Sequence, residues 1–366
     1  MECRKFGNTG LTPSILGFGM MRLKKKEDGS IDEAWAIETL RNAIDRGLTY
    51  VDTAYAYKDS ERVTGLCLQD GYREKVTLAT KLPVWMVNNQ EDFDRVLNEE
   101  LERLQTDHID VYLLHALNRE RWEHIQKTGI ISFAEKAKAD GRIRHLGFSF
   151  HDSLDVFKDI LYGYEGWEFC QLQLNYMDTH YQAGLEGLRL AHEKGLAVVI
   201  MEPLRGGALA NVPEEVAKIL PKNPVQSALE FVWNLPEVSV VLSGMSETNQ
   251  VEENLSYAEN AHAGMLSEEE NAAMLEAGAK MRAAALIPCT GCDYCHVCPQ
   301  GIPIPKIFTI FNHFQSVGTW YHAVQDYKAL GEINASKCVS CGMCVEQCPQ
   351  HIPIFENHAK IHDRLG

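Results

Sequence analysis

Residues 50–57 read Tyr-Val-Asp-Thr-Ala-Tyr-Ala-Tyr, a short apolar run that ends at a carboxylate and leads into a loop. A run of this kind predicts a buried strand. Similar runs recur along the chain, and the predicted strands are 15–20, 50–53, 76–79, 111–114, 145–149, 171–174, 197–201 and 238–242. Segments with apolar residues at helical spacing separate the strands, and the clearest are 33–45, 92–104, 122–139, 154–161 and 184–193.

This alternation of strand and helix predicts an α/β fold with a parallel sheet, and eight repeats favour a closed (β/α)8 TIM barrel over residues 1–285. Residues 4–13, with Gly-Asn-Thr-Gly at their centre, are typical of a hairpin ahead of the first strand. An open, doubly wound sheet is the alternative fold. That fold requires a Gly-x-Gly-x-x-Gly after the first strand, and the sequence has none there.

Four polar side chains lie at or just beyond the C-terminal ends of the second, third and fourth predicted strands, where barrel enzymes place their chemistry. They are Asp52, Tyr57, Lys81 and His115. Each alone could be a turn residue, a packing aromatic, a surface charge or a buried histidine. Together they suit proton transfer, because an ammonium lowers the pKa of a nearby tyrosine and a carboxylate holds that ammonium in place. An imidazole can orient a carbonyl oxygen. We therefore expect a proton-donating site matched to hydride transfer at a carbonyl carbon.

At these positions the chain resembles the aldo-keto reductase superfamily. The resemblance extends over nearly all of residues 1–285, and its matching segments are 15–22, 51–57, 79–81 and 113–115. It implies that Tyr57 is the general acid or base and that Asp52 and Lys81 tune it. It also implies that His115 orients the substrate. Trp85, just beyond the third strand, is expected to line the substrate pocket, and a simple packing role is the alternative.

The resemblance further implies a nicotinamide dinucleotide, NADPH or NADH, across the barrel mouth. The expected contact residues lie in or after five of the predicted strands: Gly19, Met20, Ser149, Gln173, Met201, Pro203, Leu204, Arg205, Gly206, Gly207, Ser243, Gly244, Met245, Gln250, Glu253 and Asn254. Met201 stands where the family usually has a tyrosine that stacks on the nicotinamide. The residues that NADPH-preferring members place around the 2′-phosphate are replaced here by Gly244, Met245 and Gln250. NADH, weakly bound NADPH, and FMN in place of the nicotinamide are therefore all open.

The last fifth of the chain holds eight of its eleven cysteines, in two runs that repeat each other. Residues 289–299 read Cys-Thr-Gly-Cys-Asp-Tyr-Cys-His-Val-Cys-Pro, and residues 338–349 read Cys-Val-Ser-Cys-Gly-Met-Cys-Val-Glu-Gln-Cys-Pro. Three cysteines at two-residue spacing, with a fourth before proline, resemble the ligand pattern of bacterial two-cluster ferredoxins. We expect a small, α-rich, ferredoxin-like domain over residues 286–366, with a helical stretch at 307–330 between the runs.

In those ferredoxins the fourth cysteine of each run binds the other cluster. The resemblance implies one 4Fe-4S cluster on Cys289, Cys292, Cys295 and Cys348. It implies a second cluster on Cys338, Cys341, Cys344 and Cys298. The first run is one residue shorter before its last cysteine, which leaves the geometry around Cys298 open. Zinc is the alternative, but the spacing fits paired zinc ligands poorly.

The overall composition is that of a globular protein, with 45% hydrophobic and 23% charged residues among 366. A net charge of −16 argues against nucleic acid or an anionic membrane as a partner. The chain opens on no secretory signal and contains no apolar run long enough to span a membrane, so we expect a cytoplasmic protein.

These features predict an oxidoreductase that acts on a small carbonyl or alcohol and is coupled to single-electron transfer through two 4Fe-4S clusters. An external electron-transfer protein is a partner that such clusters allow. Two alternatives stay open. In one, the chain is an electron carrier or redox sensor whose barrel is a docking platform. In the other, it is a carbonyl reductase whose clusters only stabilise the fold.

Overall fold

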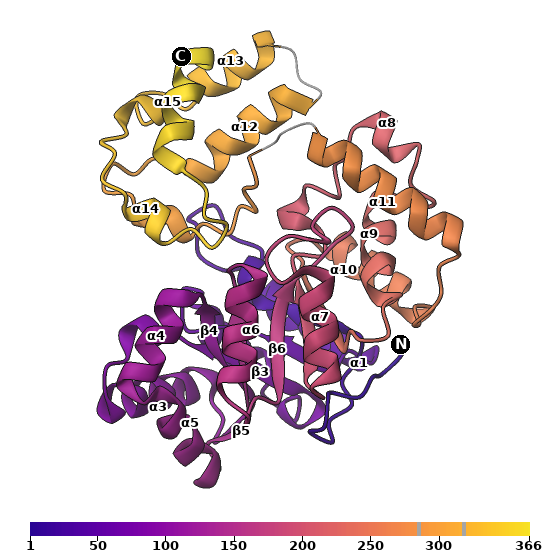
Figure 1. Cartoon of the computed structure of the whole chain (residues 1–366), viewed down its shortest axis with the longest axis vertical. Helices are drawn as coiled ribbons and strands as arrows, with labels where there is room; N and C mark the ends of the chain where they lie inside the picture. The colour runs from indigo at the N-terminus through magenta and orange to yellow at the C-terminus, as the bar shows by residue number, and fades with distance from the viewer. Residues whose placement is uncertain (284–286, 317–319) are drawn as a thin grey trace. The chain divides into compact units, whose positions relative to one another are not determined.

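The computed structural model describes residues 1–283, 287–316 and 320–366 (Figure 1). The chain forms two compact units. The first consists of Met1–Pro203 and Leu229–Ser267, and the second of Leu204–Ala228 and Glu268–Gly366. The expected domain boundary between residues 285 and 286 lies outside the described residues. The domain limits 1–285 and 286–366 therefore stay a prediction.

The first unit contains a closed barrel of eight parallel strands in which each strand pairs with its neighbour in sequence and β8 pairs with β1. The strands are β1 Leu16–Gly19, β2 Tyr50–Asp52, β3 Thr77–Leu82, β4 Ile109–Leu117, β5 Ile143–Phe150, β6 Phe169–Gln173, β7 Ala197–Met201 and β8 Val240–Gly244. Each overlaps a predicted strand. The predicted (β/α)8 barrel is confirmed.

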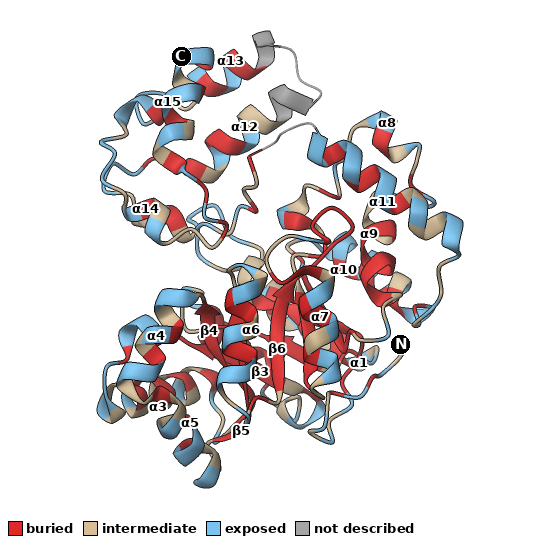
Figure 2. Cartoon of the chain, viewed as in Figure 1, coloured by how far each residue is buried: buried red, intermediate tan, exposed pale blue. Residues whose placement is uncertain are grey.

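The helices of the first unit surround this barrel, with buried inner faces and exposed outer faces (Figure 2). They are α1 Glu33–Asp45, α2 Ser60–Cys67, α3 Gln90–Leu104, α4 Arg119–Thr128, α5 Ile130–Ala139, α6 Leu154–Gly163, α7 Gly184–Glu193 and α10 Thr248–Glu259. The prediction of one helix over 122–139 is wrong. Gly129 has φ of 78° in the left-handed region, and it ends α4 and begins α5.

The hairpin predicted at residues 4–13 is present and closes the N-terminal end of the barrel. The Phe6 N–H donates to the Leu11 carbonyl at 2.9 Å, which holds the two arms together. The Phe6 side chain is fully buried, and its ring lies 5.9 Å from Tyr50 and 5.3 Å from Phe169, centroid to centroid. Tyr50 and Phe169 begin β2 and β6, so this end of the barrel is filled, which leaves the C-terminal ends for chemistry.

The second unit is mostly helical, as predicted, and its elements are α8 Glu214–Ala217, α11 Glu268–Ala283, α12 Ile304–Ser316, α13 Trp320–Lys328, α14 Met343–Glu346 and α15 Ile354–Leu365. Helix α9 Pro224–Trp233 begins in this unit and ends in the first. Helices α12 and α13 correspond to the predicted stretch 307–330, of which residues 317–319 lie outside the described residues. The apolar core of the second unit contains residues that follow both cysteine runs, and it includes Ile304, Ile307, Phe308, Ile352, Ile354 and Ile361.

Short 3-10 helices occur in both units: η1 Met20–Arg22, η2 Arg73–Lys75, η3 Val84–Met86, η4 Arg205–Gly207, η5 Tyr294–Val297 and η6 Ala335–Lys337. Among the described residues, no helix combines the length and the apolar character that crossing a bilayer requires.

Candidate active site and cysteine module

A buried ion pair lies at the C-terminal end of the barrel. The Lys81 Nζ donates to Asp52 Oδ1 at 2.6 Å and to the Thr53 carbonyl at 2.7 Å. Burial raises the pKa of Asp52 and lowers that of Lys81, and the ion pair opposes both shifts. Because water is excluded, each group depends on the other to remain charged.

Tyr57 and His115 lie beside this pair. Tyr57 is half-buried in the loop between β2 and α2, and the Lys81 Nζ lies 4.8 Å from the centroid of its ring. The rings of Tyr57 and His115 meet edge to face, with centroids 5.8 Å apart. The structure therefore brings the four predicted residues together. Lys81 and His115, predicted just beyond their strands, lie inside β3 and β4, because both strands extend further than the apolar runs indicated.

The electrostatic environment keeps His115 neutral. Burial lowers the pKa of His115 well below its usual value, and the charges of Lys81, Arg121 and His151 lower it further. A neutral imidazole keeps one N–H donor and one acceptor nitrogen. His115 is therefore suited to a hydrogen bond with a carbonyl or hydroxyl oxygen.

Trp85 and Arg121 extend this group toward solvent. The Trp85 ring lies 5.5 Å from the His115 ring and remains 37% exposed. The Arg121 guanidinium carbon lies 4.4 Å from the Trp85 centroid, and its Nη1 donates to the Ala116 carbonyl at 2.8 Å. Arg121 is in the first turn of α4, and no sequence motif there predicts a residue of the site. The sequence analysis therefore missed a cation beside the predicted histidine.

The residues expected to bind a nicotinamide on the fifth and sixth strands are buried and hydrogen-bonded within the protein. Ser149 Oγ accepts from the Ala116 N–H at 2.7 Å, next to His115. The Gln173 Nε2 donates to Asp178 Oδ2 at 2.8 Å. Asn175 donates to the same carboxylate and to the Glu202 carbonyl, which joins the loop after β6 to the residues after β7.

After the eighth strand, Asn254 has an unsatisfied acceptor. Its Nδ2 donates to Ser243 Oγ at 3.0 Å, whereas its buried Oδ1 has no hydrogen-bond partner among the described residues. A buried acceptor of this kind suits a donor on a bound ligand. Gln250 has a structural role, since its side chain and that of Glu247 form the capping box of α10.

The remaining predicted residues of the first unit differ in exposure. Gly19, Met20, Pro203 and Met245 are buried, and Glu253 is exposed. Met201 is half-buried at the end of β7, and its sulfur accepts from Gln171 Nε2 at 3.5 Å.

Gly244 lies beside a cation that sequence reasoning also missed. A Cβ placed on Gly244 would lie 3.3 Å from Arg22 Cδ. Arg22, which follows β1, also forms an ion pair with Glu202 at 3.6 Å.

The last four predicted residues after the seventh strand, Leu204, Arg205, Gly206 and Gly207, belong to the second unit. Gly206 has φ of 64°, and a Cβ placed on it would clash with the Thr290 carbonyl oxygen. This loop therefore packs directly on the first cysteine run, a contact that no sequence motif predicted.

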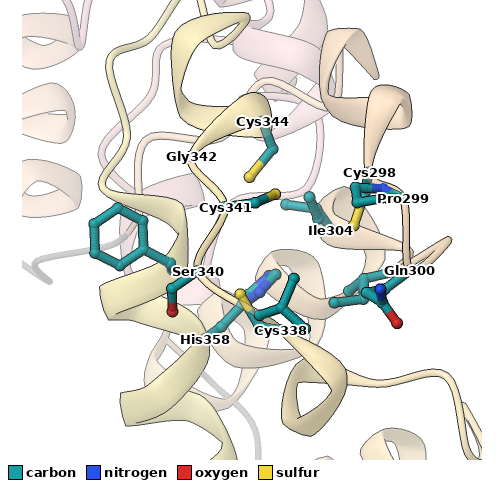
Figure 3. Close-up of a pocket in the computed structure, with 13 residues that line it drawn as sticks. Cys298, Pro299, Gln300, Ile304, Cys338, Ser340, Cys341, Gly342, Cys344 and His358 are labelled. Atoms are coloured by element: carbon teal, nitrogen blue, oxygen red, sulfur yellow. The ribbon is translucent and has the colours of Figure 1, made fainter.

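The eight cysteines lie around two pockets, and each pocket takes its cysteines from both runs. One pocket is lined by Cys289, Cys292, Cys295 and Cys348. The other is lined by Cys298, Cys338, Cys341 and Cys344, whose sulfurs surround a common space (Figure 3). These are the two ligand sets that the ferredoxin resemblance implies.

The spacing of these side chains disfavours a single metal ion. Within the described ranges, no three His, Cys, Asp or Glu side chains are close enough together to hold one ion. Tetrahedral zinc requires four sulfurs about 2.3 Å from one point. The residues present fit a multi-atom iron-sulfur cluster better than zinc.

Comparison with known proteins identifies both parts of the chain. Residues 15–277 match the model of the aldo/keto reductase family. Residues 288–352 match that of the 4Fe-4S dicluster domain. The chain therefore belongs to the aldo-keto reductase family and is an oxidoreductase that carries a 4Fe-4S dicluster domain.

Individual relatives resemble the barrel. L-galactose dehydrogenase from Arabidopsis thaliana is 29% identical over 281 residues, which cover 70% of this chain and 87% of that protein. Aldo-keto reductase YhdN from Bacillus subtilis is 38% identical over 125 residues, 31% of this chain and 38% of that protein. The holo structure of aldo-keto reductase AKR11C1 from Bacillus halodurans is 27% identical, with a TM-score of 0.66 and coverage of 76% and 96%. A Klebsiella pneumoniae aldo-keto reductase in complex with NADPH shares the fold at 24% identity, with a TM-score of 0.62 and coverage of 75% and 93%.

Proposed function

We propose that the barrel interconverts a small carbonyl compound and its alcohol by hydride transfer, with Tyr57 as general acid or base. The observation that carries this proposal is the position of Tyr57, whose ring lies close to both the buried Lys81 ammonium and the His115 imidazole. The ordinary pKa of a tyrosine is about 10, so its hydroxyl is a weak acid near neutral pH. A nearby positive charge makes proton donation easier. Lys81 provides that charge, and Asp52 holds it in place.

The roles of the four residues follow from their positions. The Tyr57 hydroxyl gives its proton to the substrate oxygen during reduction and takes it back during oxidation. The His115 N–H donates a hydrogen bond to the same oxygen and fixes its orientation. Trp85, beside His115, would form one wall of the substrate pocket. Desolvation strengthens the interaction between Lys81 and Tyr57.

A nicotinamide dinucleotide, when bound, supplies or accepts the hydride. Ser149, Gln173 and Asn254 would hold it, and the unsatisfied Asn254 Oδ1 is the acceptor in this set that a ligand donor can satisfy. The Klebsiella pneumoniae aldo-keto reductase of the same fold is in complex with NADPH, which supports a nicotinamide here. Neither the described residues of the site nor the relatives named above add support for FMN. Binding of NADPH and NADH by the purified chain, compared by calorimetry, would establish the preference.

We propose further that the barrel chemistry is coupled to one-electron transfer through the cysteine module. Two 4Fe-4S clusters, when bound, each exchange one electron, and together they match the two electrons of a hydride. The two complete cysteine sets would hold them. An external electron-transfer protein is the partner to which such a module would pass electrons.

The catalytic proposal is tested with two tyrosines of one loop. Tyr57→Phe should lower kcat for aldehyde reduction by about 10²- to 10⁴-fold, because it removes the proton donor. Tyr55→Phe is the matched control, since the Tyr55 hydroxyl donates to Glu99 on α3 at 2.7 Å and not to the site. Retained nucleotide binding in both variants would show that the fold is intact. Equal turnover in the two variants would overturn the role of Tyr57.

The coupling proposal needs a separate measurement. The anaerobically purified chain, with about eight irons, is titrated with NADPH or NADH, alone and with aldehydes. In a second series it receives alcohols together with NADP⁺ or NAD⁺, which accepts the hydride. Loss of the cluster absorbance in the wild type, but not in Tyr57→Phe with alcohol as reductant, would support coupling. A cluster spectrum that does not change while aldehyde is reduced at full rate would contradict it.

A further inference from the structure

His358 is a buried polar side chain with no hydrogen-bond partner in the described part of the chain. It is in α15, only 1% of the residue is exposed, and neither ring nitrogen has a hydrogen-bond partner among the described residues. In either protonation state the imidazole carries at least one N–H. A buried donor left unsatisfied costs about 1–3 kcal/mol. This residue therefore calls for a ligand or a structural explanation.

Its surroundings identify the acceptor. His358 lines the pocket formed by Cys298, Cys338, Cys341 and Cys344, and its ring points from α15 into that pocket (Figure 3). Ile302, Ile304 and Phe355 give this pocket apolar walls. Gln300 and Ser340 also line it, but neither forms a hydrogen bond with the His358 ring. The four cysteine sulfurs surround the common space of this pocket, so they and the sulfurs of a bound cluster are acceptors that the His358 N–H could reach.

The internal repeat supplies a natural comparison. His358 is the tenth residue after Cys348, and Phe308 is the tenth after Cys298. The helices that carry them, α15 and α12, begin at the equivalent residues Ile354 and Ile304. Phe308 lines the pocket of Cys289, Cys292, Cys295 and Cys348, in the position that His358 has in the other pocket.

Packing alone does not account for the histidine. Phe308 fills the equivalent position with an aromatic ring of similar size and no polar atom, and the two rings are neighbours with centroids 5.7 Å apart. The fold therefore accepts a phenylalanine at this type of position. Placing a histidine there adds two polar atoms to a buried position, a cost that a hydrogen bond offsets.

We propose that His358 donates a hydrogen bond to the cluster on Cys298, Cys338, Cys341 and Cys344 and makes it the more easily reduced of the two. A donor to a cluster sulfur stabilises the reduced form, which carries more negative charge, and hydrogen bonds to the sulfurs are among the factors that set cluster potentials. The first cluster has Phe308 at the equivalent place. An electron shared by the module would therefore reside mainly on the second cluster.

The inference rests on the presence of both clusters, and the experiment first measures iron and sulfide in each variant. His358→Phe gives the second site the residue of the first. The reduction potential of the second cluster should fall by about 59 mV, which is a tenfold change in the equilibrium constant for one electron. The measurement is a potentiometric titration monitored by electron paramagnetic resonance. The potential of the other cluster should stay unchanged. Phe308→His is the reciprocal variant and should raise the potential of the first cluster.

A direct readout avoids any dependence on the variants. In wild-type protein with ring-¹⁵N histidine, pulsed electron paramagnetic resonance of the one-electron-reduced module should detect coupling to an imidazole nitrogen. Its absence would overturn the proposal, even if His358→Phe failed to retain its cluster. Unchanged potentials in a fully loaded His358→Phe protein would also overturn it. Absence of iron from the wild type would instead refute the cluster assignment itself.

Discussion

At the scale of single residues, the ion pair of Asp52 and Lys81 is the most consequential contact in the barrel. Both side chains are removed from water, and their charges are separated by 2.6 Å. Asp52→Asn leaves a buried ammonium without its counter-charge, which costs about 3–5 kcal/mol of folding free energy. We expect urea unfolding of the barrel to show a loss of this size.

The matching control is the double variant Asp52→Asn with Lys81→Met. It removes both charges, and replacing a buried pair by neutral groups is often nearly neutral for stability. The double variant should therefore regain most of the stability that Asp52→Asn loses, while it remains inactive. A double variant that is less stable than the single one would show that Lys81 does not depend on Asp52 for its charge.

His115 makes a second contribution that depends on pH. Its pKa in the folded protein lies well below the usual 6.5, so the unfolded chain binds a proton more readily. The stability that neutral His115 contributes is present above pH 6.5 and is lost as the pH falls from there toward the folded-state pKa.

His115→Gln removes this titration, and the comparison of wild type with variant isolates it from other groups. The wild type should lose more unfolding free energy than His115→Gln between pH 7 and pH 5. The measurement is urea unfolding at a series of pH values. Parallel curves for the two proteins would mean that His115 is not held neutral by its surroundings.

At the scale of elements, helix α3 is joined to strand β4 by a buried carboxyl group. The Tyr112 hydroxyl donates to Glu100 Oε2 at 2.5 Å, and neither residue has any exposed surface. Burial raises the pKa of Glu100 well above its usual value, and the nearby Glu61 raises it further. The folded protein therefore keeps Glu100 protonated over a range in which the unfolded chain ionises it.

The raised pKa of Glu100 makes the free energy of unfolding decrease as the pH rises. The stability that protonated Glu100 contributes is complete below pH 4.5 and is lost as the pH rises toward its folded-state pKa. Glu100→Gln stays neutral, so it should become increasingly more stable than the wild type as the pH is raised from 5 to 9. Glu99→Gln is the opposite control, because a hydrogen bond from Tyr55 lowers the pKa of Glu99. A stability difference for Glu100→Gln that does not change with pH would contradict this interpretation.

The elements themselves were largely predictable, because each strand of a closed barrel is buried and apolar. Helices α1 and α7 have the predicted bounds. The break at Gly129 was not predicted, because the apolar spacing continues across it and a single glycine is tolerated inside a helix. The lengths of β3 and β4 were also underestimated, because the apolar pattern does not mark their C-terminal ends. Polar Lys81 ends an apolar run but continues the ladder between β3 and β4, where it pairs with Leu113. His115 lies in β4 at a shift of register between Leu114 and Leu117, which no apolar run indicates.

The residues of the site were predictable only where a motif marked them. Asp52, Tyr57, Lys81 and His115 lie at or near the C-terminal ends of strands and share a known chemistry. Arg121 reaches Trp85 from a helix, and the sequence holds no signal for that contact. His358 differs, because the alignment of the two repeats already pairs it with Phe308, and that signal was overlooked.

At the scale of the whole chain, the cysteine module depends on a crossing between its two repeats. Each pocket takes three cysteines from one run and the fourth from the other. The consequence is that Cys348→Ala, in the second run, should remove the first cluster. Cys298→Ala, in the first run, should remove the second. Each variant should retain about four irons. Cys170→Ala, in the buried strand β6, is the control and should retain all the iron.

In the alternative without a crossing, the four cysteines of each run would bind one cluster. The coupling of the His358 imidazole to a reduced cluster distinguishes the two arrangements. If the fourth cysteines cross, Cys348→Ala keeps the cluster beside His358, and ring-¹⁵N coupling persists in its reduced form. Cys298→Ala should lose that coupling together with its cluster. The reverse result would assign each run to its own cluster and would move His358 to the cluster on Cys338, Cys341, Cys344 and Cys348. Because metal binding supplies folding energy to small domains, loss of either cluster should also make the second unit easier to unfold in urea.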